Sequence, residues 1–165
     1  MRKTKIVLAV LLVAAFFIFA AGSGESSTTD QGSGTANTET KGNDSIGKYS
    51  VVIDSCRLAS DYAGKPVVIV KYQFTNVSDD NPTAFYIAFD DNVYQNGVGL
   101  NGAYVLDDNA NYSADNQTKA IKKGASIDVE VAYELNDTTS EIEVEVEELF
   151  SFSDNKLIKK FSIAN

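Results

Sequence analysis

The chain has 165 residues, a formal charge of −9 and a single cysteine, and it contains no histidine. Without imidazole no histidine-dependent catalytic triad can form, and a lone cysteine permits neither an intrachain disulfide nor intrachain thiol–disulfide exchange. Zinc sites lose both of their preferred ligand types. An acidic surface repels phosphate backbones and anionic headgroups, so nucleic-acid binding and peripheral membrane binding are not expected.

The N-terminus carries a basic tip followed by an apolar run, Ile6 to Ala21, which is typical of a secretion signal. The run is shorter than the about 20 residues that a membrane-spanning helix requires. We therefore predict a signal peptide over residues 1–22, cleaved after Gly22, and a secreted or extracellular protein associated with the cell envelope. The alternative is an uncleaved N-terminal anchor, the only expected contact of this chain with a membrane.

Residues 23–47 are rich in Gly, Ser, Thr and Asn, with Ala36 and Ile46 as the only apolar side chains. Such a segment buries too little apolar surface to fold alone. We predict a disordered linker that acts as a flexible tether. The folded domain is then expected over residues 48–165.

From residue 48 onward apolar and polar residues alternate, which predicts strands with one buried and one exposed face. The run 67–74 is apolar on both faces and predicts a central strand. Asn96-Gly97 predicts a two-residue hairpin turn, because both positions require positive φ. Further strands are expected at 85–89, 93–95, 98–100, 127–135, 142–146 and 157–163, with Asp90-Asp91-Asn92 closing the first of these. Seven to eight short strands predict an all-β fold, an immunoglobulin-like antiparallel β-sandwich.

Cys56 lies in another apolar-rich run, 51–58. Free cysteines in such surroundings behave as small hydrophobic side chains. We expect a buried, inert thiol with a packing role.

Four short motifs follow one another along the domain: PVVIVKYQFTN (66–76), YQNGVGL (94–100), IKKG (121–124) and AYEL (132–135). Together they resemble a family of domains of unknown function, the immunoglobulin-like domain of secreted Gram-positive lipoproteins, and the resemblance covers roughly residues 46–164. The resemblance implies a fold and a compartment, and no catalytic activity is attributed to the family. Relatives carry a lipid-acceptor cysteine directly after the apolar run. This chain has Gly22 there, so no thioether-linked lipid can be attached.

Asp-Asp-Asn occurs three times, at 79–81, 90–92 and 107–109. Oxygen-rich loops suit Ca²⁺, but the spacing does not match an EF-hand, and Asp and Asn also favour turns because their side chains bond to nearby backbone. We prefer the turn interpretation and expect no cofactor. Under the calcium alternative the candidate ligands are Asp90, Asp91, Asp107 and Asp108.

A row of glutamates alternates along one predicted strand, at 141, 143, 145 and 147, so that they share one face with a repeat of about 6.6–7 Å. Such a row could bind a cationic ligand, a peptide or a wall amine. We prefer a solvated face that Lys156 and Lys160 neutralise if the last strand pairs alongside.

Long loops on a rigid sandwich often carry recognition, and the longest here is the polar segment 101–117. Its candidate ligand-binding residues are Tyr104, Asp107, Asp108 and Tyr112. We expect a non-catalytic binding or adaptor module whose partner is a protein, a peptide or an envelope component. The alternatives are a calcium-stabilised architectural spacer and a carboxylate-dependent hydrolase, although no pair of acids is marked as catalytic.

Overall fold

Strands account for most of the structure, a computed structural model that describes residues 36–37, 45–105, 111–151 and 155–164. Two short helical turns, α1 (Phe85–Ala88) and η2 (Asp115–Gln117), lie between strands. The strands of the described ranges are β1 (Ala36–Asn37), β2 (Ser45–Ile46), β3 (Tyr49–Ser60), β4 (Pro66–Asn76), β5 (Phe89–Gln95), β6 (Val98–Gly99), β7 (Ser126–Glu134), β8 (Ile142–Glu148) and β9 (Lys156–Phe161).

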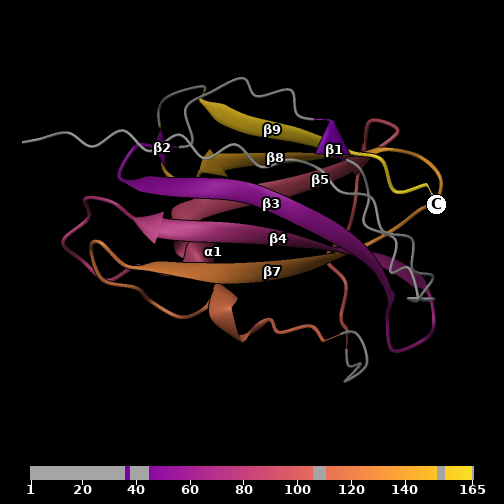
Figure 1. Cartoon of the computed structure of the whole chain (residues 1–165), viewed down its shortest axis with the longest axis horizontal. Helices are drawn as coiled ribbons and strands as arrows, with labels where there is room; N and C mark the ends of the chain where they lie inside the picture. The colour runs from indigo at the N-terminus through magenta and orange to yellow at the C-terminus, as the bar shows by residue number, and fades with distance from the viewer. Residues whose placement is uncertain (1–35, 38–44, 106–110, 152–154, 165) are drawn as a thin grey trace, which may run out of the picture. The chain divides into compact units, whose positions relative to one another are not determined.

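The strands form two antiparallel sheets that lie face to face (Figure 1). A five-stranded sheet has the order β1-β9-β8-β5-β6, and a four-stranded sheet has the order β2-β3-β4-β7. One hydrophobic core contains most of the buried apolar residues of both sheets, while Val67, Ile69 and Ala132 are buried outside it. The immunoglobulin-like antiparallel β-sandwich predicted from the alternation is therefore confirmed.

The central strand predicted from the apolar run is β4, which pairs with β3 and β7. Val67 to Val70 are 0% exposed, as a strand covered on both faces requires. The other half of β4 contributes to an aromatic cluster in which neighbouring ring centroids lie 5.1 to 6.0 Å apart. Tilted and edge-on rings at such separations stabilise a core beyond the area that they bury. The cluster consists of Tyr49, Tyr72, Phe74, Phe85 and Phe89.

The strand predicted over 85–89 is wrong, because Phe85–Ala88 forms a helical turn, α1, ahead of β5. The buried residues are Phe85, Ala88 and Phe89, and this spacing of three and four residues places them on one helical face. Ile87, which a period of two would bury, is 45% exposed. Phe85 and Phe89 satisfy both periods, so alternation alone did not separate strand from helix.

The two turns predicted around β5 have opposite outcomes. The hairpin at Asn96-Gly97 is confirmed: it joins β5 to β6, with φ of 53° at Asn96 and 76° at Gly97. The turn at 90–92 is wrong, since these residues lie inside β5 and pair with β8. Asn92 Nδ2 donates to the carboxylate of exposed Asp90 at 3.1 Å. Asp91 points to the opposite face, into the sandwich.

Part of the predicted linker, residues 23–47, is paired strand: β1 pairs with β9 and β2 pairs with β3. Ile46 is 3% exposed and belongs to the core, so the folded domain begins before residue 48. The predicted signal peptide, 1–22, and the rest of the linker lie outside the described residues. Within the described ranges, no helix has the length and apolarity needed to cross a membrane.

Polar contacts join the two sheets at two places, between β9 and β3 and between β7 and β5. On one side Lys159 Nζ of β9 donates to the carbonyl oxygens of Ile53 (2.8 Å) and Asp54 (2.9 Å), where a register shift interrupts the pairing of β3. A β-bulge leaves backbone groups without ladder partners, and the lysine satisfies two of them. On the other side the Tyr133 hydroxyl of β7 donates to the carboxylate of Asp91 in β5.

Candidate functional site

The loop predicted to bind a ligand is partly described, and Asp107 and Asp108 lie outside the described residues. Tyr104 is 70% exposed. Tyr112 is half-buried, and its hydroxyl accepts a hydrogen bond from Gln117 Nε2 at 3.2 Å. Gln117 also donates to the backbone carbonyl of Glu130 in β7 at 2.6 Å. Tyr112 therefore helps to hold the loop against the sheet, and Tyr104 is the exposed residue of the two.

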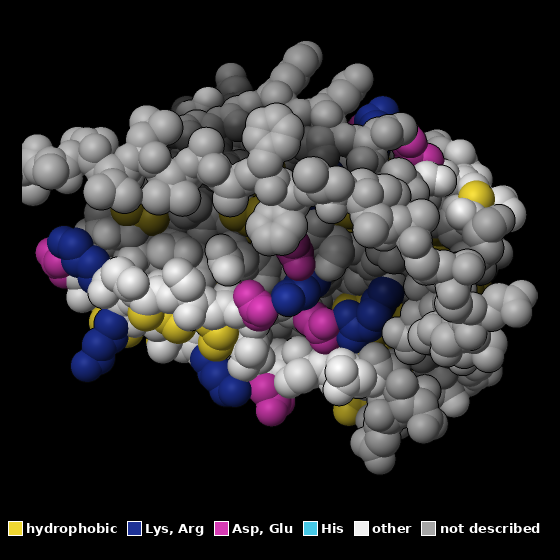
Figure 2. Space-filling model, in the orientation of Figure 1, with side chains coloured by type: hydrophobic (Ala, Val, Ile, Leu, Met, Phe, Trp, Pro, Cys, Tyr) yellow, Lys and Arg dark blue, Asp and Glu magenta, His cyan; other side chains and the backbone are white. Residues whose placement is uncertain are grey.

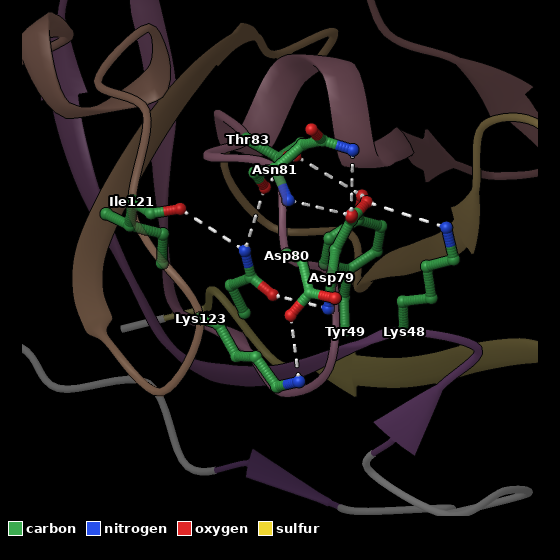
Figure 3. Close-up of polar contacts among 9 residues, drawn as sticks. Lys48, Tyr49, Asp79, Asp80, Asn81, Thr83, Ile121 and Lys123 are labelled. Carbon is green, nitrogen blue, oxygen red and sulfur yellow. Dashed lines mark hydrogen bonds and ion pairs between the residues drawn. The ribbon is translucent and has the colours of Figure 1, made fainter.

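The Asp-Asp-Asn segment at 79–81 is a turn held by its own side chains (Figure 3). Asp79 accepts hydrogen bonds from the Tyr49 hydroxyl (2.8 Å) and from the backbone N–H of Asn81 (3.1 Å). The hydrogen bond from Asn81 holds the pKa of the Asp79 carboxyl below its usual value. Asp80 pairs with Lys123 at 3.0 Å. This copy of the motif is a turn, as its composition predicts.

The calcium alternative named Asp90 and Asp91, but these carboxylates point to opposite faces of β5. Asp90 is on the solvent side, opposite Glu147 of β8. Asp91 is on the core side, where Tyr133 donates to it. The two therefore do not converge on one ion. In the part of the chain that the structure describes, no group of three or more acidic or cysteine residues is placed to hold a metal ion.

Asp91 is the centre of a polar cluster between the sheets. Tyr133 donates to its carboxylate and also, at 3.2 Å, to its backbone carbonyl. The fully buried hydroxyl of Tyr72 lies beside this pair without meeting the geometry of a hydrogen bond to either residue. Burial raises the pKa of the Asp91 carboxyl, because the interior disfavours its charged form.

This cluster predicts a pH dependence of stability. A carboxyl whose pKa is higher in the folded state than in the unfolded state stabilises the fold below the unfolded pKa, and that contribution is lost as pH rises through the folded pKa. Asp91→Asn keeps an acceptor for Tyr133 and removes the charge. We expect the variant to melt at a higher temperature than the native protein at pH 7, with the difference vanishing below about pH 4.

Thermal unfolding between pH 3 and pH 8 checks this expectation. Asp90→Asn is the matched control, since it makes the same charge change on the solvent side of the same strand. A lower melting temperature for Asp91→Asn at pH 7, or equal pH profiles for the two variants, would contradict it.

The described surface contains a groove on the outer face of the five-stranded sheet, with a volume of about 590 Å³. This volume lies within the range typical of small-ligand sites, about 300–1,000 Å³. Strand β8 and the residue before it supply the acidic floor, while the β5–β6 hairpin and β9 supply the two walls. The lining residues are Tyr94, Asn96, Gly97, Glu141, Glu143, Glu145 and Lys160.

The acidic floor comes from the glutamate row predicted from the sequence. Since β9 pairs with β8, Lys160 lies opposite Glu143, at 3.2 Å between Nζ and the carboxylate, and it reaches Glu141 at 3.9 Å. Lys156 lies 3.1 Å from Glu145. The predicted neutralisation by the last strand is therefore confirmed. It is incomplete, because among the described residues of this face carboxylates outnumber ammonium groups: the acids are Asp90, Glu141, Glu143, Glu145 and Glu147, and the bases are Lys156 and Lys160.

The opposite outer face, that of the four-stranded sheet, has a different character. It faces the viewer in Figure 2, where acidic and basic side chains lie side by side. Arg57 of β3 makes a bidentate pair with Glu130 of β7, at 2.6 and 3.1 Å. Lys71 of β4 lies 3.0 Å from Asp128 and 3.8 Å from Asp54. Charge on this face is locally matched.

The hairpin wall of the groove is held in place from two sides. The Tyr94 ring packs over Gly99 of β6, where a Cβ would lie 3.7 Å from the nearest ring atom. Gln95, 1% exposed, anchors the hairpin to the loop between β7 and β8. Its Nε2 donates to the carbonyls of Asp137 (3.0 Å) and Ser140 (3.1 Å), and its Oε1 accepts from the N–H groups of Asn136 (2.9 Å) and Asp137 (3.2 Å).

Sequence reasoning found the glutamate row and the Asn96-Gly97 turn but not their meeting in one groove. The available signal was that Tyr94 and the glutamates both occupy outward positions of predicted strands. The missing information was that β5 pairs with β8, which sequence alternation does not reveal.

The thiol of Cys56 is half-buried, and burial raises its pKa to about 11, so it is protonated and unreactive at neutral pH.

Together these features define an all-β sandwich domain with an acidic groove on one outer face. The chain belongs to the family described as "Domain of unknown function (DUF5067)", whose model matches residues 24–148. The resemblance drawn from the short motifs is thereby confirmed. No catalytic family is indicated, and the comparison with curated proteins found no match.

Two solved structures share the fold. A putative lipoprotein from Staphylococcus aureus has 21% sequence identity and a TM-score of 0.56, over 79% of this chain and 92% of that chain. A second one so described, from Bacillus subtilis, has 18% identity and a TM-score of 0.55, over 77% of this chain and 39% of that chain. At these identities the likeness concerns the fold.

Proposed function

We propose that this protein is an exported, non-catalytic binding module of the cell envelope, and that the acidic groove over β8 is its binding surface. The observation that carries the proposal is the groove itself, a concavity on a sheet face with two different walls. The apolar N-terminal run with its basic tip supports export, and the lipoprotein description of both structural relatives supports an envelope location.

The described lining of the groove consists of three glutamates, one lysine, one tyrosine, one asparagine and one glycine, and this set of side chains supports binding over catalysis. Its carboxylates project from alternate positions of one strand on an open sheet face, and a lysine lies against two of them. Hydrolysis of glycosides requires two carboxyl groups held across a substrate, one of them with a raised pKa. The Asp91 carboxyl, whose pKa burial raises, faces the core and lies outside the groove.

Photo-crosslinking in intact cells that export the protein tests the proposal. A photoreactive phenylalanine analogue is placed at Tyr94 in the groove wall, at Tyr104 in the loop predicted from the sequence, or at Tyr62, which is 71% exposed on the β3–β4 turn. We expect a discrete product from position 94 that Glu143→Lys abolishes, and none from position 62. Products from position 104 alone, equal products from all three positions, or none at all would overturn the groove as the binding surface.

A further inference from the structure

We propose that the occupant of the groove is an extended basic peptide segment in which lysine or arginine recurs at every second residue. This inference rests on the proposed function and names the class of partner. Three features of the groove carry it: its direction, its excess of negative charge, and the way in which the protein's own lysines already fill part of it.

The direction of the groove favours an extended chain. Glu143 and Glu145 lie on alternate positions of β8, and Glu141 directly precedes that strand with the same spacing. Side chains on one face of a strand repeat every about 6.6–7 Å, and so do those of any extended peptide laid along it. Such a peptide therefore keeps in step with the carboxylates without distortion.

The charge of the groove favours a cation. Its described lining has three glutamates and one lysine, and the neighbouring Lys156 is already paired with Glu145 and Glu147 at 3.1 and 3.6 Å. Both members of the Lys160–Glu143 pair are at least a third exposed, so the pair is hydrated and can exchange with an incoming ammonium group.

The protein itself already places two basic side chains on this row. In β9, Lys156, Ile158 and Lys160 occupy alternate positions on the outer face, and the two lysines bind the glutamates of β8. The two lysines are thus four residues apart, and Ile158 between them lies opposite Glu145, so β9 neutralises only part of the row. A peptide with a basic residue at every second position offers an ammonium or guanidinium group to each glutamate of the row. A peptide adds a backbone beside Asn96 and an aliphatic stem against the Tyr94 ring, which forms the other wall.

A titration of the exported protein with defined peptides tests the inference. One peptide alternates four lysines with threonines, and a second has the same composition with its lysines in one block; spermidine is the third ligand. Dissociation constants are measured at one low salt concentration. We expect the alternating peptide to bind at least about fivefold more tightly than the blocked one, since only its charges match the repeat of the row.

Variants separate the groove from the general acidity of the chain. Glu143→Gln with Glu145→Gln is expected to weaken the alternating peptide about tenfold. Asp54→Asn with Asp128→Asn makes the same charge change on the other sheet and is expected to change binding by less than about twofold. Lys160→Gln is expected to strengthen binding, because it removes the competing ammonium group. Thermal unfolding verifies that every variant is folded.

Equal affinities for the two peptides, equal losses in the two double variants, or spermidine binding as tightly as the alternating peptide would each overturn the inference. If the peptides fail while the crosslink from position 94 persists, the groove remains the binding surface and only the occupant is wrong. If both fail, the proposed function fails with it.

Discussion

Replacing Gln95 with alanine is expected to lower the free energy of unfolding by about 2–4 kcal/mol. The side chain is 1% exposed and makes four hydrogen bonds to the backbone of the β7–β8 loop. Removing it leaves partly buried backbone donors and acceptors without partners. A fully buried group would cost about 1–3 kcal/mol, and water entering the loop offsets part of this cost. Urea denaturation followed by circular dichroism measures the change.

Gln73→Ala is the matched control, because Gln73 has the same side chain at an exposed position of β4. We expect it to change stability by less than about 0.5 kcal/mol. A Gln95 variant as stable as the Gln73 variant would show that the loop does not depend on this anchor.

The Gln95 variant also bears on the groove. Ser140, whose carbonyl accepts from Gln95, directly precedes Glu141, and Asn96 directly follows Gln95. The hairpin wall and the acidic floor are therefore tied to each other through one side chain. We expect any ligand of the groove to bind more weakly to the folded variant, with little change in the Gln73 variant.

Replacing Phe74 with alanine is expected to cost about 3–5 kcal/mol, the range for removing a fully buried aromatic side chain. Phe74 is 0% exposed and its ring lies 5.8 to 6.0 Å from those of Tyr49, Phe85 and Phe89. These neighbours come from β3, α1 and β5, so the surroundings cannot collapse into the space without moving both sheets. Denaturant midpoints at constant m-value measure the loss.

Phe150→Ala provides the control for Phe74, since Phe150 is 80% exposed. We expect its effect to stay within about 0.5 kcal/mol. Phe74→Leu should fall between the two, because it retains much of the apolar volume. A loss below about 1 kcal/mol for Phe74→Ala would mean that the aromatic cluster is not the centre of the core.

Some features were predictable because their cause is local. The alternation that placed Val129 and Tyr133 on the buried face is a property of any strand, and the Asn96-Gly97 turn follows from the conformations that these two residues tolerate. The glutamate row followed from the same rule. Where a local pattern has two solutions, as for Phe85 and Phe89, packing selected the helical one.

Asp91 shows why other features were not predictable. An Asp-Asp-Asn triplet is locally a good turn, and the copy at 79–81 is one. The copy at 90–92 is strand because β8 pairs with it and because Tyr133, from the other sheet, donates to the inward carboxylate. The partner that makes this burial tolerable is 42 residues away in the chain.

Composition and periodicity alone established the β class, the buried faces of most strands, and the lack of imidazole and intrachain disulfide chemistry. These properties depend on residue identity and on nearest neighbours along the chain. Pairing in space established the rest. Only the placement of β8 between β5 and β9 brings Tyr94, the glutamates and Lys160 together. That order depends on how the two sheets bury their apolar faces against each other. Because this packing involves segments that are far apart in the chain, no short stretch of sequence determines it.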